Sequence, residues 1–207
     1  MAAEPTVFVV DDNPGVRKSL RSLIESAGLK AETYASAEEF LGAFDAQRPG
    51  CLLLDVRLRQ GSGLDLQDEL RQRKVTLPII VMTGYGTVPV SVRALKAGAV
   101  DFLEKPVPPK ILIERVRAAI DIDRDTREAA ARRAAVAQRI VQLTPRELEV
   151  MEQLVAGKTS KEIAVALNLS VRTVEGHRRM VLWKMEAAST SQLISTVIST
   201  RSKPYTS

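Results

Sequence analysis

Short apolar runs alternate with amphipathic stretches along residues 1–120, and this alternation limits the possible folds more than any other feature. Apolar runs of this length, flanked by loop residues, are typical of buried strands, and the stretches between them have helical spacing. Prolines and glycines near their ends suit helix starts and stops. The expected strands are residues 7–10, 29–34, 51–54, 77–82 and 100–103, and the expected helices are 16–27, 37–45, 64–73, 90–97 and 110–120.

Five strands that alternate with five helices predict βαβ units, and hence a parallel sheet covered by helices on both faces. Because crossover connections in such sheets are right-handed, only a few topologies remain. We therefore expect residues 1–122 to form a doubly wound α/β domain with a five-stranded parallel sheet.

The composition changes at residues 121–143, which are rich in Ala and Arg and contain no Gly or Pro. This composition favours helix, but its apolar residues are mostly alanine and can build little core. We expect a helical linker over residues 123–143, and one option is that it continues the fifth helix.

No strand pattern returns after residue 143. Thr144 and Glu147, with Pro145 between them, match a capping box with proline at the first helical position. We therefore expect residues 144–207 to form a separate all-α domain. Its helical patterns lie at 145–155, 160–167, 171–185 and 191–200.

Composition limits the location and the partners. No apolar stretch reaches the length of a membrane span, and the N-terminus lacks the basic and apolar regions of a secretory signal. We therefore expect a cytoplasmic protein with no membrane partner. The single cysteine, Cys51, excludes an internal disulfide and is expected to serve packing. Residues 144–207 carry nine basic and six acidic side chains, which permits a polyanionic partner.

Polar side chains follow the strong strands. Asp11 and Asp12 come after the first strand, Asp55 after the third, Thr83 after the fourth and Lys105 after the fifth. In a parallel sheet these strand ends meet at one edge, where ligands bind. Three close carboxylates would raise one another's pKa, and a hard cation such as Mg²⁺ relieves that repulsion.

This set of side chains suits phosphoryl transfer. Asp55 is a candidate nucleophile that would form an aspartyl phosphate, while Thr83 and Lys105 would bind the remaining phosphate oxygens. A plainer alternative is that each aspartate caps a helix or loop. The order of the whole set along the strands favours a functional site.

Two other kinds of phosphate site fit less well. A phosphatase of the haloacid-dehalogenase type needs a second Asp two residues after its nucleophile, and Arg57 stands there. A flavodoxin-like flavin site needs a loop rich in hydroxyls and glycine after the first strand, whereas the loop here, DDNPG, is acidic.

The motifs VVDD at 9–12, LLLD at 52–55, MTG at 82–84 and FLEKP at 102–106 resemble the receiver domain of bacterial two-component response regulators. The resemblance covers residues 5–122 and implies a flavodoxin-like sheet of strand order 2-1-3-4-5, Mg²⁺ as the metal, and a cis peptide before Pro106. It also implies roles for individual residues. Asp55 would be the phosphoacceptor; Asp11, Asp12, Asp55 and the backbone carbonyl of Arg57 would bind the metal; Thr83 and Phe102 would be switch residues; and Lys105 would contact the phosphoryl group.

Residues 160–179 show the pattern of helix, tight turn and helix. Ile163 and Val174 are spaced to pack against each other, and Ser170 can cap the second helix. The remaining surface of that helix is polar and basic, which suits insertion into the major groove; a solvated helix face is the alternative. Glycine in mid-helix costs about 1 kcal/mol of stability relative to alanine. Gly176 is therefore either simply tolerated at this position or present because it allows the helix to approach the groove closely.

The string LTPRELEVMEQLVAGKTSKEIAVALNLSVRTVEGHRRMVLWKM resembles the LuxR-type helix-turn-helix, over residues 140–203. Glu175 departs from the basic residue that relatives often carry, so no operator sequence can be inferred. By this resemblance Glu175, Gly176 and Arg179 would face the bases, Arg172, Thr173, His177 and Arg178 would lie nearer the phosphates, and Lys161 would be a weaker candidate.

Together the two resemblances indicate a response regulator of the FixJ/NarL class, and MTGYGTVPVSVRALKAGAVDFLEKP is nearest to the FixJ branch. They imply a FixL-like sensor histidine kinase, double-stranded DNA and RNA polymerase as partners, a homodimer after phosphorylation, and activation of transcription, with nitrogen-fixation genes as possible targets. The protein would be no enzyme beyond phosphoryl transfer to its own Asp55. The alternatives are a Mg²⁺-dependent phosphatase with a DNA-targeting module, and a constitutive DNA-binding protein with a degenerate receiver.

Overall fold

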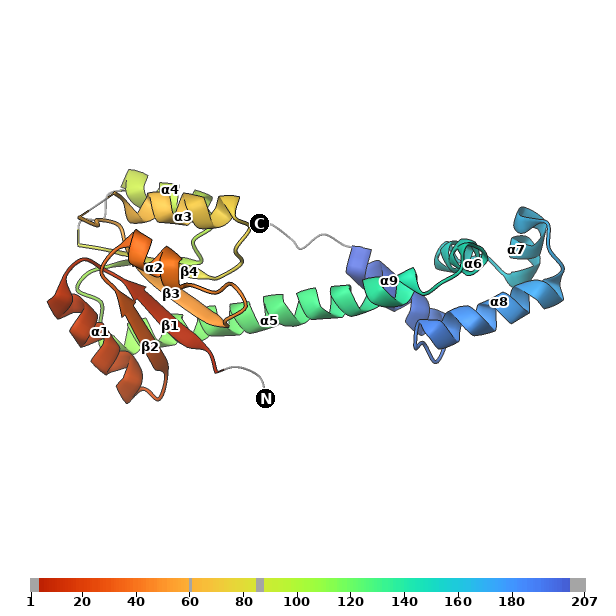
Figure 1. Ribbon diagram of the computed structural model, residues 1–207, viewed down its shortest axis with the longest axis horizontal. Coiled ribbons are helices and arrows are strands. Elements are labelled where there is room, and N and C mark those ends of the chain that lie inside the picture. The colour runs from red at the N-terminus through yellow and green to blue at the C-terminus, as the bar shows by residue number, and fades with distance from the viewer. Residues whose placement is uncertain (1–3, 60, 85–87, 202–207) are drawn as a thin grey trace. The chain divides into compact units, whose positions relative to one another are not determined.

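The computed structural model describes residues 4–59, 61–84 and 88–201, and the chain divides into two compact units between Arg127 and Glu128. No helix in these ranges is both long and apolar enough to cross a membrane. The elements of the first unit are β1 (Thr6–Val10), α1 (Pro14–Ser26), β2 (Lys30–Tyr34), α2 (Ala37–Ala43), β3 (Gly50–Asp55), α3 (Gly63–Gln72), β4 (Ile79–Thr83), α4 (Val88–Lys96), β5 (Asp101–Glu104) and the first part of α5 (Pro109–Val141) (Figure 1).

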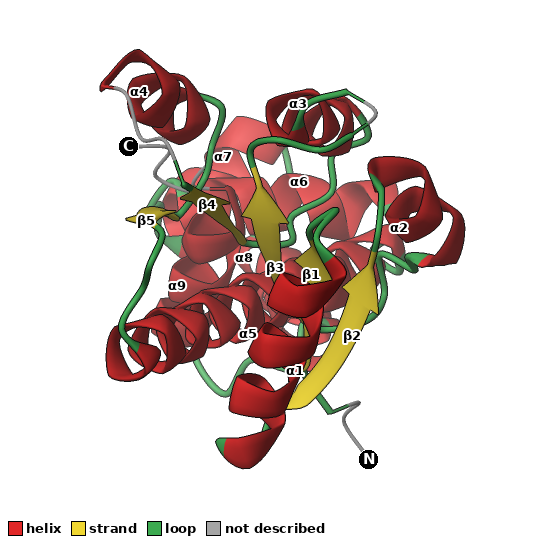
Figure 2. Ribbon diagram, turned by 90° about the vertical axis from the view of Figure 1, so that its left-hand side faces the viewer, coloured by secondary structure: helices red, strands yellow, loops and turns green. Residues whose placement is uncertain are grey.

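The five strands form one parallel sheet of order β2-β1-β3-β4-β5. This confirms the predicted doubly wound sheet and its strand order. Helices α1 and α5 cover one face of the sheet, and α2, α3 and α4 cover the other (Figure 2).

The central strands β1 and β3 are buried along their whole length. Successive side chains enter the two cores in turn: Phe8 and Leu52 pack toward α2, α3 and α4, and Val9 and Leu53 pack toward α1 and α5. Cys51 is fully buried in β3, and burial raises the pKa of its thiol to about 12, so the thiol stays protonated at neutral pH. The strand that ends in Asp55 is therefore held on both faces.

Several element ends differ from the predicted ones. Strand β3 includes Asp55, because the ladder to β4 continues through the pair Asp55 and Met82. Strand β4 begins only at Ile79, since Pro78 has no N–H to give to a ladder. Helix α5 continues past residue 120 to Val141, because the stretch contains neither Gly nor Pro to end it, and this confirms the option that the linker continues the fifth helix.

A buried ion pair fastens the middle of α5 to the first unit. Asp123 is 1% exposed and accepts hydrogen bonds from the backbone N–H of Gly50 and from Nε of Arg127, both at 2.8 Å. The Arg127 guanidinium also donates to three consecutive backbone carbonyls in the loop before β3. These belong to Ala46, Gln47 and Arg48.

The second unit comprises the end of α5 and the helices that follow it. Its core includes Val150, Ile163, Val174 and Leu193. The capping box of Thr144 and Glu147 is present as predicted. The helices after α5 are α6 (Pro145–Val155), α7 (Ser160–Leu167), α8 (Val171–Lys184) and α9 (Thr190–Arg201).

The Asp123–Arg127 pair generates a stability prediction. We expect Arg127→Met to lower the free energy of unfolding by about 2–3 kcal/mol, because it leaves the buried Asp123 carboxylate with too few partners. Arg132→Met is the matched control: Arg132 pairs with Glu128 at the same helical spacing, but both side chains are exposed, so we expect a change below about 0.5 kcal/mol. Urea denaturation followed by circular dichroism measures both, and equal effects would contradict a specific role for Arg127.

Candidate functional site

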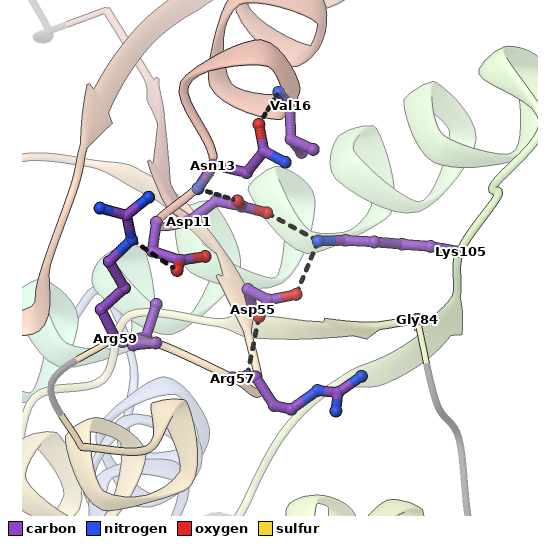
Figure 3. A pocket seen from close by; sticks show the side chains of 10 residues that line it. Asp11, Asn13, Val16, Asp55, Arg57, Arg59, Gly84 and Lys105 are labelled. Carbon is purple, nitrogen blue, oxygen red and sulfur yellow. Dashed lines mark hydrogen bonds and ion pairs between the residues drawn. The ribbon is translucent and has the colours of Figure 1, made fainter.

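A cavity of about 370 Å³ opens at the carboxyl-terminal edge of the sheet. Residues that end or follow the strands line it, because parallel strands end at the same edge. Figure 3 shows the side chains of Asp11, Asp55 and Lys105 converging there. The cavity is lined by Asp11, Asp12, Asn13, Val16, Asp55, Arg57, Leu58, Arg59, Gly84 and Lys105.

The ammonium group of Lys105 lies between two carboxylates. Its Nζ atom is 2.6 Å from Oδ2 of Asp11 and 2.6 Å from Oδ1 of Asp55. These side chains come from the ends of three different strands, so only the folded sheet brings them together. Charge-assisted bonds of this length are among the stronger hydrogen bonds in proteins.

Each of the two carboxylates uses its other oxygen to accept a backbone hydrogen bond. Asp55 accepts from the N–H of Arg57 at 2.7 Å, and Asp11 accepts from the N–H of Asn13 at 2.9 Å. Asp11 is 1% exposed and Asp55 is 7% exposed. The orientation of both carboxylates is therefore set by the turns that follow their strands.

The surroundings of Asp55 act on its protonation in opposite directions. Burial raises the pKa of Asp55, and the negative charge of Asp11 adds to the rise, while Lys105 and the N–H of Arg57 lower it; the net pKa is above the ordinary value. For Lys105, burial alone would lower the pKa, but its bonds to Asp11 and Asp55 outweigh this and raise it. Lys105 therefore stays protonated, while the ionised form of Asp55 is less stable in the folded protein than in water.

Thr83 and Phe102 lie beside this group. Thr83 ends β4 and is 2% exposed, and its backbone carbonyl accepts a hydrogen bond from the N–H of Lys105 at 2.7 Å. Phe102 lies in β5 and packs, partly buried, against the core below α4. Gly84 is the residue after β4 that lines the cavity. The Lys105–Pro106 peptide bond is cis, as the resemblance implied.

Two polar residues of the cavity were not identified from the sequence. Asn13 caps α1 by accepting a hydrogen bond from the N–H of Gly15 at 2.9 Å, and an Asn directly before Pro14 was a usable signal for this. Arg59 lies 3.5 Å from Asp12 and is 81% exposed along its side chain, so the pair is weak. No sequence pattern marks Arg59.

The donor set of the cavity fits Mg²⁺. Within the described ranges, no three His, Cys, Asp or Glu side chains are already arranged as a group of metal ligands, and Lys105 holds two of the three carboxylates. Mg²⁺ needs only one or two carboxylates, with water and phosphate oxygens completing its shell. Asp11, Asp12 and Asp55 line a single cavity and can supply such ligands.

Helices α7 and α8 form the predicted helix-turn-helix arrangement. Asn168 ends α7 in the left-handed conformation (φ 53°), and the Ser170 hydroxyl caps α8 by accepting from the N–H of Thr173 at 3.0 Å. Ile163 and Val174 are both fully buried in the shared core. On the side of α8 opposite Val174, Arg172 and Arg179 are exposed.

The predicted DNA contacts on these helices differ in how free their side chains are. Arg178 donates to the hydroxyls of Ser160 at 3.2 Å and Thr190 at 2.8 Å, and Glu175 accepts from the hydroxyl of Ser160. Arg178 thus connects α8 to the starts of α7 and α9. His177 and Gly176 are half-buried, whereas Lys161, Arg172, Thr173, Glu175 and Arg179 are exposed.

The pKa shift of Asp55 generates a pH-dependent prediction. Because its pKa in the folded protein lies above the ordinary 3.8, ionised Asp55 destabilises the fold above the folded pKa, and this cost vanishes below the unfolded value. We therefore expect Asp55→Asn to be more stable than the wild type at pH 7 without divalent cations, with the gain disappearing toward pH 3. Asp45→Asn, in an exposed loop, is the control. Urea denaturation at several pH values measures the difference, and a gain that grows in acid would contradict the assignment.

Comparisons with known proteins match both units. Residues 7–117 match the family described as "Response regulator receiver domain", and residues 141–197 match "Bacterial regulatory proteins, luxR family". The transcriptional regulatory protein FixJ of Azorhizobium caulinodans is 44% identical over 91% of this chain and 89% of its own. The transcriptional regulatory protein TdiR of Thauera aromatica is 40% identical over 91% of this chain and 83% of its own.

Solved structures agree with these matches. The response regulator StyR has a TM-score of 0.84 and 36% identity, covering 95% of this chain and 99% of its own. Full-length FixJ from B. japonicum has a TM-score of 0.60 and 36% identity, covering 96% of this chain and 98% of its own. The chain therefore belongs to the bacterial response regulators that join a receiver domain to a LuxR-type DNA-binding domain.

Proposed function

We propose that this response regulator is switched by phosphorylation of Asp55. The observation that carries the proposal is the position of Asp55 at the end of a buried strand, with one oxygen bound to Lys105 and Asp11 sharing the same ammonium. A carboxylate held in this way is oriented for attack by its surroundings rather than by a substrate. The phosphoryl donor would be the phosphohistidine of a separate, FixL-like sensor histidine kinase.

The transfer step uses groups of this chain. An Asp55 carboxylate oxygen attacks the phosphorus, the phosphorus–nitrogen bond of the donor breaks, and its electron pair leaves with the imidazole. Lys105 lies where its ammonium can move from the Asp55 oxygen to a phosphoryl oxygen, and Thr83 would bind another. Asp11, Asp12, Asp55 and the carbonyl of Arg57 would hold Mg²⁺, which when bound neutralises charge on the phosphoryl group. The protein would act on its own Asp55 and on no other substrate.

The switch would pass from Thr83 and Phe102 to the surface of α4 and β5. Val92 and Leu95 on α4 are 42% and 49% exposed, and the nearby Val100 is 38% exposed. An apolar surface of this kind supports the proposal that two phosphorylated receivers associate through it. A homodimer would present two copies of α8 about one DNA turn apart, which suits a partly palindromic site.

The output would be regulation of transcription. We propose that the dimer binds double-stranded DNA, cooperates with RNA polymerase and activates its target genes, with nitrogen-fixation genes as candidates because FixJ proteins are among the relatives. We retain a division into a receiver (1–122), a helical linker (123–143) and a DNA-binding domain (144–207), in a cytoplasmic protein. A Mg²⁺-dependent phosphatase is less favoured because Arg57 occupies the position of its second aspartate.

Incubation with acetyl phosphate and Mg²⁺ tests the proposed phosphorylation. We expect mass spectrometry to show one added phosphoryl group, absent from Asp55→Asn, and light scattering to show a dimer that forms only with the modified protein. Asp45→Asn should behave as the wild type. Continuous release of inorganic phosphate in many turnovers, with no stable adduct, would favour the phosphatase instead, and no reaction would contradict both.

The role of the acidic pair has its own test. We expect Asp12→Asn to lower the rate of phosphorylation at limiting Mg²⁺ on the order of 10- to 100-fold, because loss of a ligand or its support weakens metal binding by such factors. Excess Mg²⁺ should recover part of the rate, and EDTA should abolish it in both proteins. A rate that Asp12→Asn leaves unchanged would remove Asp12 from the metal site.

A further inference from the structure

The outward face of α8 carries a large aromatic side chain that the predicted DNA contacts do not include. Trp183 is 73% exposed, and Met180 beside it is 42% exposed. A single exposed apolar residue is ordinary in itself. The position of Trp183 relative to the other residues of the helix makes it informative.

Trp183 continues a stripe of the helix that begins with the DNA contacts. At 3.6 residues per turn, Arg172, Gly176, Arg179 and Trp183 lie on one side of α8. The opposite side holds Val174 and Val181, which are fully buried. The stripe therefore points away from the core of the second unit along its whole length.

Packing within the described chain does not require a glycine at position 176 of this stripe, because there is room for a larger side chain. A Cβ atom added at Gly176 would meet nothing within 4 Å, although glycine costs about 1 kcal/mol in mid-helix. A bare position on an otherwise open surface is consistent with a backbone that comes close to a partner. The partner surface would thus lie directly over the middle of the stripe.

The charges of the stripe favour a polyanion as this partner. Arg172 and Arg179 are exposed on it, whereas Glu175, at its margin, accepts a hydrogen bond from Ser160 and lies 3.7 Å from Arg178. The exposed charge of the stripe is therefore positive. Double-stranded DNA matches this charge, and an apolar partner helix does not.

The length of the helix determines which part of the DNA Trp183 can reach. Trp183 lies two turns beyond Gly176, which is about 10 Å along the axis, and the major groove is about 12 Å wide. With Gly176 over the bases, Trp183 lies beyond the base edges and next to the sugar-phosphate backbone. Within the described chain its indole N–H has no hydrogen-bond partner, so it can donate to a phosphate oxygen while the ring covers a deoxyribose.

We propose that Trp183 is a DNA-backbone contact that extends the recognition surface of α8 beyond the major groove. This inference rests on the proposed DNA-binding function and adds a neutral, sequence-independent contact to it. An aromatic donor of this kind positions the helix on the duplex, because phosphate contacts set the register and carry no sequence information.

Trp183 is the only tryptophan of the chain, so its fluorescence reports on this position alone. The full-length protein, treated with acetyl phosphate and Mg²⁺, is titrated with a labelled random-sequence duplex of about three helical turns at low salt. The label anisotropy measures binding, and acrylamide quenching measures the access of solvent to Trp183. We expect quenching to fall several-fold when the anisotropy shows that the duplex is bound.

Variants separate this contact from a charge contact. We expect Trp183→Ala to weaken binding about five- to tenfold and Trp183→Phe about threefold, since Phe keeps the ring but loses the donor. The salt dependence of binding should stay unchanged in both, whereas Arg179→Ala should reduce its slope by about one. Val141→Ala, at an 84% exposed position in the same unit, is the control and should bind as the wild type.

Several outcomes would overturn the proposal. If the duplex binds while Trp183 stays as accessible as in the free protein, or if Trp183→Ala binds as tightly as the wild type, the contact does not exist and the DNA-binding function stands. If Trp183→Ala loses affinity only for a duplex selected from a random pool, Trp183 reads bases instead. If Trp183 is protected by raising the protein concentration without DNA, the stripe is an interface between copies. If no duplex binds, the inference and the proposed function both fail.

Discussion

The shared ammonium of Lys105 is the interaction on which the site depends. Two carboxylates, Asp11 and Asp55, are almost fully buried at the edge of the sheet and would repel each other without a cation between them. Lys105 supplies that cation from a third strand end, 2.6 Å from each. Under the proposed switch, Lys105 would exchange one of these bonds for a bond to a phosphoryl oxygen, and the same ammonium would stabilise both the resting and the phosphorylated site.

The fold makes this arrangement rigid. Strand β3 is buried on both faces, and its packing fixes the backbone position of Asp55. The N–H of Arg57 orients the second carboxylate oxygen of Asp55. The contacts of helix α5 differ along its length. Up to Arg127 it is fastened to the first unit through Asp123 and the carbonyls of the loop before β3, whereas the following turns belong to the second unit. One continuous helix thus belongs to both units.

In the second unit, the charge of a side chain does not by itself predict whether that side chain is available for a partner. Arg172, Arg178 and Arg179 are equally basic in the sequence, yet Arg178 is engaged with Ser160 and Thr190. Such engagement cannot be predicted from spacing along α8, because its partners lie on two other helices. In the first unit, likewise, Arg59 enters the cavity without any sequence pattern, while the strand-end residues that line it followed from the parallel topology.

Local patterns of the sequence were enough to determine the order of strands and helices, the capping residues Thr144 and Ser170, and the set of polar residues at the strand ends, because these depend on periodicity and on neighbours along the chain. The tertiary structure alone decided that Lys105 lies between Asp11 and Asp55, that Asp123 is buried against Gly50, and which basic side chains of α8 remain free. These are contacts between residues far apart in the chain, and their distances and burial arise only when the sheet and the helices pack.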